Sequence, residues 1–226
     1  MGSNISKIED AVYDFYRRNY PDVWFLAPPF LASVGAIGFV GYSFANNRAV
    51  PSSPNVSFSH LLGVAGGFGI SFWMNTVHGT AMFRLLTRQD FGTVQSHISS
   101  VYFSSTAVLA SLSLGTFLLR HPYNTWSKDA ANLGIALTVA LICAEVNSIV
   151  LSPLVTNLMF DRNNIEFIQS AKSSDEIEKL HAEDPKYRII SNKFSLFHSL
   201  SLATGLVYHG LQWYHLWFLA DKCLVL

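Results

Sequence analysis

Long stretches of the chain contain no Asp, Glu, Lys or Arg, and this feature limits the possible fold more than any other. Four such stretches, 25, 35, 29 and 27 residues long, cover residues 23–47, 49–83, 91–119 and 194–220. A fifth, residues 130–160, is interrupted only by Glu145. Because about 20 mainly apolar residues cross a bilayer as a helix, each stretch is long enough to span a membrane. We therefore expect an all-α polytopic membrane helix bundle.

The runs predict five spans, near residues 24–44, 59–84, 91–119, 130–155 and 194–218. The first span is the weakest, because Pro28-Pro29 starts or kinks the helix and residues 30–44 alone would be short. Four spans plus a segment that dips into the membrane is the alternative. The predicted division is a leader (residues 1–22), an extra transmembrane helix (23–45) and a four-helix bundle (58–220) with a cytosolic loop (161–192).

Composition excludes several functions. Only 13% of the residues are charged, and Lys+Arg and Asp+Glu both number 15, so nothing favours nucleic-acid binding. The two cysteines, Cys143 and Cys223, are too few for a disulfide framework or a structural zinc site. We expect no cofactor and no metal site.

The leader lacks the apolar core of a cleaved signal peptide. Ile8, Val12 and Phe15 instead share one helical stripe, and Ser6 with Glu9 matches a capping box. An amphipathic helix is expected, lying on the membrane surface or packed against this chain or a partner. The Met1 to Ser6 segment also fits the pattern for myristoylation of Gly2.

Basic residues predict the orientation. Eleven Lys or Arg residues flank the spans on the amino-terminal side of the membrane and four on the other side. We expect a cytosolic amino terminus and a lumenal carboxy terminus, in the endoplasmic reticulum or another secretory-pathway membrane. Asn55, in an Asn-Val-Ser sequon of the first lumenal loop, is then a candidate glycosylation site. Cys223 resembles a prenylation site but would lie on the wrong side for the cytosolic enzyme.

Polar side chains occur inside four of the spans, and we expect them to meet in one layer about 8–15 Å below the cytosolic rim. Glu145 is the costliest member, disfavoured by ~2.5–3.5 kcal/mol unless paired or protonated. The expected partner of the Glu145 carboxyl group is a histidine or Arg84. The layer is interpreted either as a hydrogen-bond network that fixes helix register or as a cytosol-facing pocket for a lipid head group, a proton or a small ligand; the spacing favours a metal only weakly. Its residues are His78, Arg84, Gln95, His97, Glu145, Asn147 and His198.

Glycines predict where helices approach closely. Gly35, Gly38 and Gly41 recur on the first span, and Gly63 and Gly67 form a Gly-x-x-x-Gly on the second. The first span is expected to dock on this bundle or, with a slight preference, on another protein. In the loop of residues 161–192, a capping box at Ser173 predicts a short helix that ends before Asp184-Pro185.

Specific motifs between about residues 70 and 210 indicate a family. They are Trp73, Gly79, Phe83-Arg84, Arg88, Phe91-Gly92, Val94-Gln95-Ser96, Tyr102-Phe103, Val146-Asn147, Pro153, Asp184-Pro185-Lys186-Tyr187, Phe194 and His198-Ser199. In these residues the chain resembles the transmembrane protein 205 family. The resemblance implies a four-helix membrane protein of the secretory pathway, linked to platinum-drug resistance and vesicle traffic, without an agreed biochemical activity. The first span and the leader lie outside it.

These observations favour a non-catalytic membrane protein over an enzyme, because no nucleophile with a base is evident. We expect a subunit or scaffold of a larger membrane assembly, with lipid handling or transfer as a hypothesis. Its partners would be membrane lipids and a larger membrane protein that contacts the first span and leader. The alternative is a small transporter or proton-coupled carrier that uses the intramembrane Glu and His residues.

Overall fold

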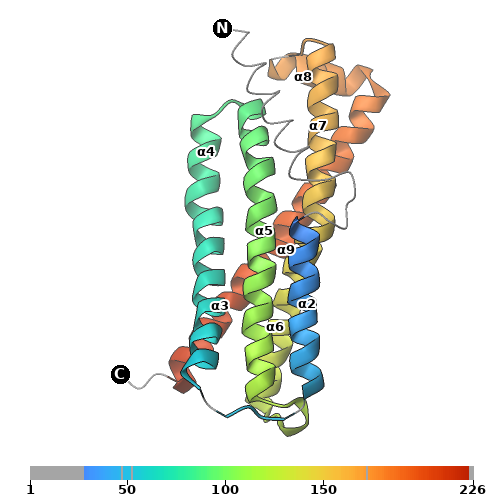
Figure 1. Ribbon diagram of the computed structural model, residues 1–226. Coiled ribbons are helices and arrows are strands. Elements are labelled where there is room, and N and C mark those ends of the chain that lie inside the picture. Colours follow the sequence, from blue (N-terminus) through green and yellow to red (C-terminus); the bar gives the residue numbers. More distant parts are fainter. Residues whose placement is uncertain (1–27, 47, 52, 172, 224–226) are drawn as a thin grey trace.

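The computed structural model describes residues 28–46, 48–51, 53–171 and 173–223, which form an all-α bundle (Figure 1). The predicted leader and Gly2 lie outside the described residues. The helices are α2 (Pro28–Asn46), α3 (Pro54–Phe72), α4 (Gly79–Leu85), α5 (Arg88–Arg120), α6 (Lys128–Val146), α7 (Ser152–Ile168), α8 (Ser174–Glu183) and α9 (Pro185–Cys223). Two π-helical segments, η2 (Trp73–His78) and η4 (Asn147–Leu151), and a short 3₁₀ turn, η3 (Tyr123–Thr125), complete the order.

Side-chain caps determine where several helices begin. The hydroxyl groups of Ser53, Thr87 and Ser127 each accept a hydrogen bond from a backbone N–H of the first turn of α3, α5 and α6. The capping box predicted at Ser173 is confirmed, since both of its hydrogen bonds with Glu176 are present at the start of α8. Helix α8 ends at Glu183, before Asp184-Pro185, as predicted.

Four helical rods are long and apolar enough to cross a membrane: Pro28–Asn46, Pro54–Leu85, Arg88–Arg120 and Lys128–Ile168. They correspond to the first four predicted spans. The last rod joins α6, η4 and α7 without a break and ends 13 residues beyond the predicted boundary at residue 155. The predicted loop of residues 161–192 is therefore mostly helical.

The fifth predicted span, residues 194–218, is helical throughout but differs in composition from the other four. It lies within α9, which has 39 residues but is not among the described helices apolar enough to cross by composition. The physical reason is that α9 carries many polar side chains that bond to other helices, such as Ser201 to Asn147 and His209 to Ser71. Helix α9 nevertheless runs obliquely along the whole bundle, from the end near α8 to the start of α3 (Figure 1).

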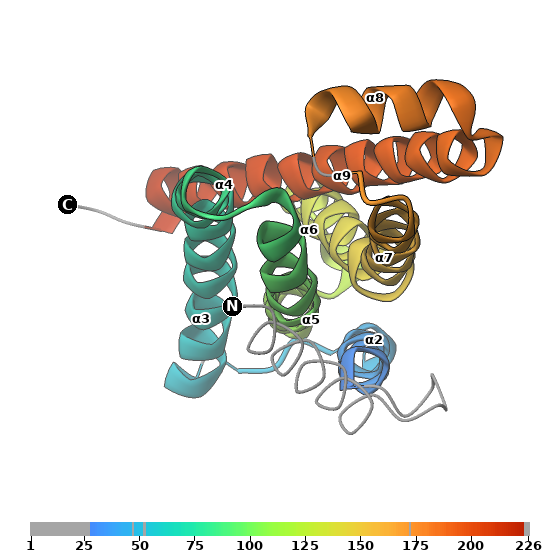
Figure 2. The ribbon, with the colours of Figure 1, turned by 90° about the horizontal axis from the view of Figure 1, so that it is seen from above.

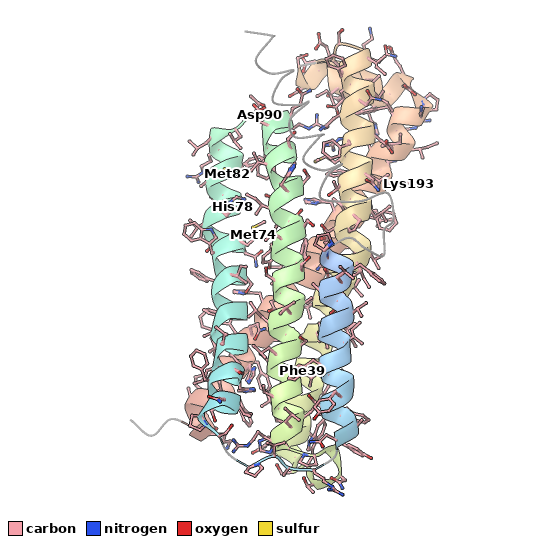
Figure 3. The ribbon with its side chains drawn as sticks, viewed as in Figure 1. Phe39, Met74, His78, Met82, Asp90 and Lys193 are labelled. Atoms are coloured by element: carbon pink, nitrogen blue, oxygen red, sulfur yellow. The ribbon has the colours of Figure 1, made fainter. Side chains whose placement is uncertain are left out.

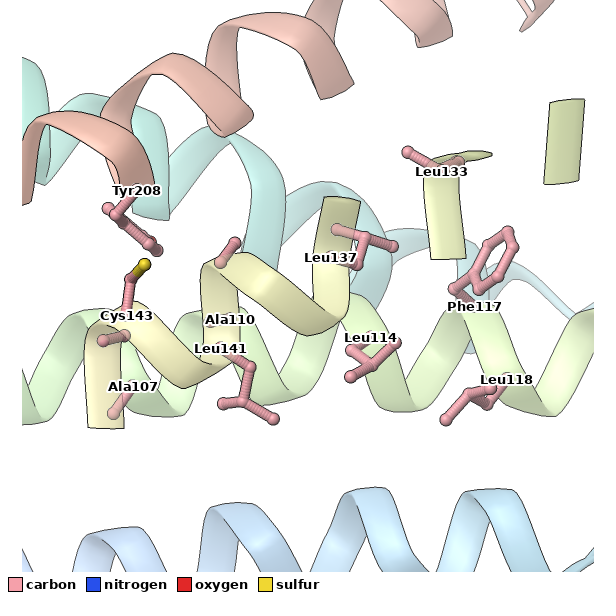
Figure 4. Close-up of a cluster of buried hydrophobic side chains, with 12 residues drawn as sticks. Ala107, Ala110, Leu114, Phe117, Leu118, Leu133, Leu137, Leu141, Cys143 and Tyr208 are labelled. Atoms are coloured by element: carbon pink, nitrogen blue, oxygen red, sulfur yellow. The ribbon is translucent and has the colours of Figure 1, made fainter. Parts of the chain in front are cut away.

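Helix α5 lies at the centre of the bundle and contacts α2, α3, α6 and α7. Seen from above, α9 runs along one side of α3, α6 and α7, while α2 lies on the opposite side of α5 (Figure 2). The core forms between α5 and α6, where Ala107, Ala110, Leu114, Leu137 and Leu141 pack together, with Tyr208 of α9 at one end (Figure 4).

The predicted close approach at Gly63 and Gly67 is confirmed. A Cβ atom at Gly63 would lie 2.5 Å from the Ser113 hydroxyl oxygen, and one at Gly67 would lie 2.6 Å from the Tyr208 hydroxyl oxygen. Only glycine lets α3 approach α5 and α9 this closely, which is the usual function of small residues between membrane helices.

Candidate functional site

His78 lies at the end of η2, with 8% of its surface exposed. Met74, His78 and Met82 follow one another along the side of the α3–α4 rod that faces α5 (Figure 3). The Nε2 atom of His78 is buried and has no hydrogen-bond partner among the described residues. π-Helical segments are rare and often mark functional positions, which makes His78 a candidate for ligand contact.

Gln95 and His97 lie on α5. The Nδ1 atom of His97 is 2.9 Å from the backbone oxygen of Thr93, so this nitrogen is engaged within its own helix. The Oε1 atom of Gln95 is buried and without a partner in the described part of the chain.

Asn147, the first residue of η4, links α6 to α9. Its Nδ2 donates to the Thr204 hydroxyl oxygen at 2.7 Å, and its Oδ1 accepts from the Ser201 hydroxyl at 2.7 Å. A further donation reaches the Ser201 backbone oxygen at 3.3 Å. Both polar atoms of the Asn147 amide are thus hydrogen-bonded, and the residue is 1% exposed. Asn147 therefore fits a network that holds helices together better than it fits an open pocket.

Glu145 is 7% exposed, and both of its carboxyl oxygens are buried without a hydrogen bond from the described residues. The expected partners, a histidine or Arg84, do not pair with it. The polar group that interacts with it is the hydroxyl of Ser33 on α2, which is itself buried and has no hydrogen bond of ordinary geometry. Glu145 therefore faces the extra amino-terminal span.

Because α6, η4 and α7 are continuous, Glu145 lies far from any charged residue along this helix. The nearest charged residues along the helix, Asp129 and Asp161, are each 16 positions away, or about 24 Å on either side. His78 and His97 lie only about 10 Å from Arg84 and Asp90. Glu145 therefore lies farther from the next charged residue than the about 8–15 Å used for the predicted layer, because the helix continues to Ile168 through part of the predicted loop.

Two other predicted residues lie at the edge of the bundle. Arg84 is exposed near the end of α4. His198 stacks on Phe194 of its own helix, with ring centroids 5.3 Å apart. The guanidinium group of Arg162 lies over the same Phe194 ring, 4.1 Å from its centroid. The structure thus brings Asn147 to α9 and Glu145 to α2, but it does not join the seven predicted residues into one hydrogen-bonded cluster.

A charged cluster that sequence reasoning missed lies where α5, α7 and α9 meet. The Glu166 carboxylate is 1% exposed, and its Oε1 atom accepts from Arg88 Nη2 at 2.9 Å and from the Tyr187 hydroxyl at 2.6 Å. Arg162 Nε lies 3.6 Å from the same oxygen. Arg88 and Tyr187 belong to the motifs of the resemblance. These two motifs were the only sequence features that pointed to this cluster. Nothing in the sequence indicated that the carboxylate of Glu166 joins them.

The glycosylation candidate Asn55 is exposed in the first turn of α3. Among the described residues, no group of three or more His, Cys, Asp or Glu side chains is arranged to hold a metal ion.

The long apolar helices define the class: a multi-pass, all-α membrane protein. Residues 62–164 match a family model described as a domain of unknown function, DUF4149. The chain is also 26% identical to transmembrane protein 205 of Danio rerio over 159 residues, which cover 67% of this chain and 85% of that protein. These two matches confirm the resemblance to the transmembrane protein 205 family. No solved structure matches the chain.

Proposed function

We propose that this chain is a non-catalytic subunit or scaffold of a larger membrane assembly, and that α2 presents a docking face for a transmembrane helix of another protein. Helix α2 begins before the region that matches the family model, residues 62–164. A partner recognised through α2 would therefore be particular to chains that carry this extra span.

One face of α2 already packs on this chain. Ser33, Ala36 and Ser43 are buried, and the ring of Phe39 lies against Gly115 of α5. Figure 3 shows Phe39 between the two helices. The first span therefore packs against its own bundle, which is the less favoured of the two expected docking modes.

The glycines occupy a different face of α2. Gly35, Gly38 and Gly41 are exposed, and a Cβ atom added at any of them would meet nothing within 4 Å. Each glycine in a helix interior costs about 1 kcal/mol relative to alanine, so three of them need a compensating contact. Small residues allow close packing of membrane helices, and no described residue of this chain uses that face. The unused glycine face is the observation that carries the proposal.

A groove supports the lipid-handling part of the proposal. It has a volume of ≈ 590 Å³ and lies between the start of α2, Ile70 of α3 and the middle of α5. The groove is lined by apolar residues such as Val101 and Val108, together with the hydroxyl-bearing Ser105. The volume falls within the usual 300–1,000 Å³ of ligand sites, and an acyl chain matches the mainly apolar lining.

The proposed location follows from charge. With the eleven basic residues facing the cytosol, the end of the bundle that holds Arg88 and Glu166 is cytosolic, and the end that holds Arg120 and Lys128 is lumenal. The compartment proposed is the endoplasmic reticulum or another secretory-pathway membrane.

Affinity purification of the full chain from native membranes tests the docking face. Gly38→Leu fills the glycine face at a position where an added Cβ atom meets nothing within 4 Å, so the recovery of a co-purifying membrane protein should fall at least tenfold by quantitative mass spectrometry. Gly210→Leu is the matched control, because Gly210 is also exposed with nothing within 4 Å but lies on α9. Equal recovery of every partner from the wild type and Gly38→Leu would exclude α2 as the docking helix.

A small proton-coupled carrier is the second candidate, favoured by the carboxyl group of Glu145, which is buried without a hydrogen bond from the described residues. Intramembrane carboxyl groups without a fixed counter-ion are common in proton pathways. In proteoliposomes this function requires that Glu145→Gln abolish proton-dependent flux while the purified protein stays folded. Unchanged flux in the variant would remove the candidate.

A further inference from the structure

Two histidines that are far apart in the sequence meet between α3 and α9. His60 Nε2 lies 3.2 Å from His215 Nε2, and the residues are 155 positions apart in sequence. His215 is 0% exposed, whereas His60 is partly exposed. Neither belongs to the predicted polar layer, and neither is needed for the proposed docking on α2.

The hydrogen on His60 can be assigned from its neighbour. His60 Nδ1 lies 2.9 Å from the hydroxyl oxygen of Thr116. The single hydroxyl hydrogen of Thr116 is already donated to backbone oxygens, at 2.6 Å to Leu112 and 3.1 Å to Ser113. Thr116 must therefore accept from His60 Nδ1–H, which leaves the Nε2 atom of neutral His60 with a free lone pair directed at His215.

His215 has two possible tautomers. If Nε2 carries the hydrogen, it donates to His60, but Nδ1 then remains a buried acceptor without a partner among the described residues, as does Oε1 of Gln212. Gln212 lies about one helical turn away on α9. If Nδ1 carries the hydrogen, it becomes a buried donor, and no hydrogen bond joins it to Oε1 of Gln212 in the described part of the chain. In that tautomer His215 Nε2 carries a lone pair, and this lone pair faces the lone pair on Nε2 of His60.

Two facing lone pairs repel each other unless a cation lies between them. We propose that His60 and His215 form a binding site for a divalent transition-metal cation of the zinc or copper class. Two imidazole nitrogens bound at 2.0–2.1 Å to a tetrahedral ion are about 3.3 Å apart, close to the 3.2 Å between these atoms. Imidazole is a preferred ligand of both metals.

The surroundings resemble those of known metal-bound histidines. Such a histidine donates its other N–H to an oxygen that fixes the ring, and Thr116 does this for His60. Two protein ligands leave further positions for water or a small anion. Arg120 and His121 are the neighbouring groups whose charge acts on His60, and they oppose a bound cation. An anion in an open position would offset this effect.

The location gives a path for entry. His60 is six residues from the start of α3 at Pro54, and His215 is eight residues from the end of α9 at Cys223, so they lie about 9 Å and about 12 Å from a helix end. The partial exposure of His60 allows an ion to arrive from that side, which the proposed orientation makes lumenal.

Metal titration of the full chain in detergent tests the site. After treatment with a chelator, Zn²⁺ should bind with one ion per chain, measured by calorimetry and by elemental analysis after desalting. His60→Ala and His215→Ala should each weaken binding at least tenfold. His209→Ala is the matched control, because His209 also lies on α9 and bonds to Ser71, outside the pair.

Two further measurements remain informative if an alanine variant does not fold. Thr116→Val keeps both ligands but removes the oxygen that orients His60, and loss of such a partner typically weakens metal binding 10–100-fold. Electron paramagnetic resonance of bound Cu²⁺ should show coupling to two imidazole nitrogens. Absence of stoichiometric binding, or binding that Thr116→Val and the two alanine variants leave unchanged, would overturn the proposal.

Discussion

Tyr187 donates its hydroxyl hydrogen to Glu166 at 2.6 Å and so ties the first turn of α9 to the end of α7. The same carboxylate oxygen pairs with Arg88 at the start of α5. Three helices that meet at one end of the bundle are thus held by a single buried charge. Removing either partner leaves polar groups buried and unsatisfied, which costs more than the hydrogen bond itself contributes.

Tyr187→Phe removes the hydroxyl and leaves the ring. We expect the free energy of unfolding to fall by ~1.5–3 kcal/mol, the usual value for a hydrogen bond to a charged group. Glu166→Gln should cost more, because it leaves Arg88 and Arg162 without their counter-ion. Unfolding in mixed detergent micelles, followed by tryptophan fluorescence, measures both changes.

Glu183→Gln is the control for these variants. Glu183 forms a 3.9 Å ion pair with Lys179, and both side chains are largely exposed. Such pairs contribute little, so the free energy of unfolding should change by less than ~0.5 kcal/mol. A loss in this variant as large as in Glu166→Gln would show that charge in general, not this contact, determines stability.

Asn147→Ala should separate η4 from α9. One hydrogen bond between membrane helices contributes ~0.6 kcal/mol on average and ~1.7 kcal/mol at most, and Asn147 makes two with side chains. Asn75→Ala provides the comparison, since Asn75 lies in the other π-helical segment and is exposed. Equal melting temperatures for the two variants would contradict the linking function of Asn147.

Gly67→Ala tests close packing of α3 against α9. The added methyl group would meet the Tyr208 hydroxyl and the Gln212 amide at 2.6 and 2.8 Å. We expect a loss of ~1–3 kcal/mol, typical of an overpacked contact. Gly69→Ala, on the same helix, meets nothing within 4 Å and should be neutral or stabilising. Comparable losses in both variants would indicate a general intolerance of α3 to alanine.

Glu145→Gln should leave stability unchanged or raise it. Neither carboxyl oxygen accepts a hydrogen bond within the described chain, so the neutral amide gives up little. A buried hydrogen-bond network that fixes helix register would give the opposite result, a loss similar to that of Asn147→Ala. Melting temperatures of Glu145→Gln and Asn147→Ala, measured together, distinguish a structural hydrogen-bond network from a carboxyl group that serves function.

Local and periodic features could be predicted from the sequence. The charge-free stretches gave the first four spans, the Ser173 capping box gave α8, and Gly63 and Gly67 indicated a tight contact. Each depends on residues close together in the chain. For α9 the charge-free stretch predicts residues 194–218 but not the start at Pro185, because Lys186, Arg188 and Lys193 interrupt the apolar pattern.

Contacts between distant segments could not be predicted. His60 and His215 are 155 residues apart, and nothing near either of them indicates the other. The sequence predicts a loop at Glu166, because the run of apolar residues ends at Phe160, but the helix continues to Ile168. Glu145 faces Ser33 of α2 and Asn147 bonds to α9, so the predicted polar layer divides into separate contacts.

Photo-crosslinking from α2 in native membranes tests the docking proposal most directly. Benzoylphenylalanine placed at Ile37, 53% exposed beside the glycine face, should form a discrete adduct with one other membrane protein, and Gly38→Leu in the same chain should abolish it. The same probe at Leu206 of α9, 63% exposed, should not form that adduct. Only lipid adducts at Ile37, or identical protein adducts at both positions, would contradict a docking function of α2.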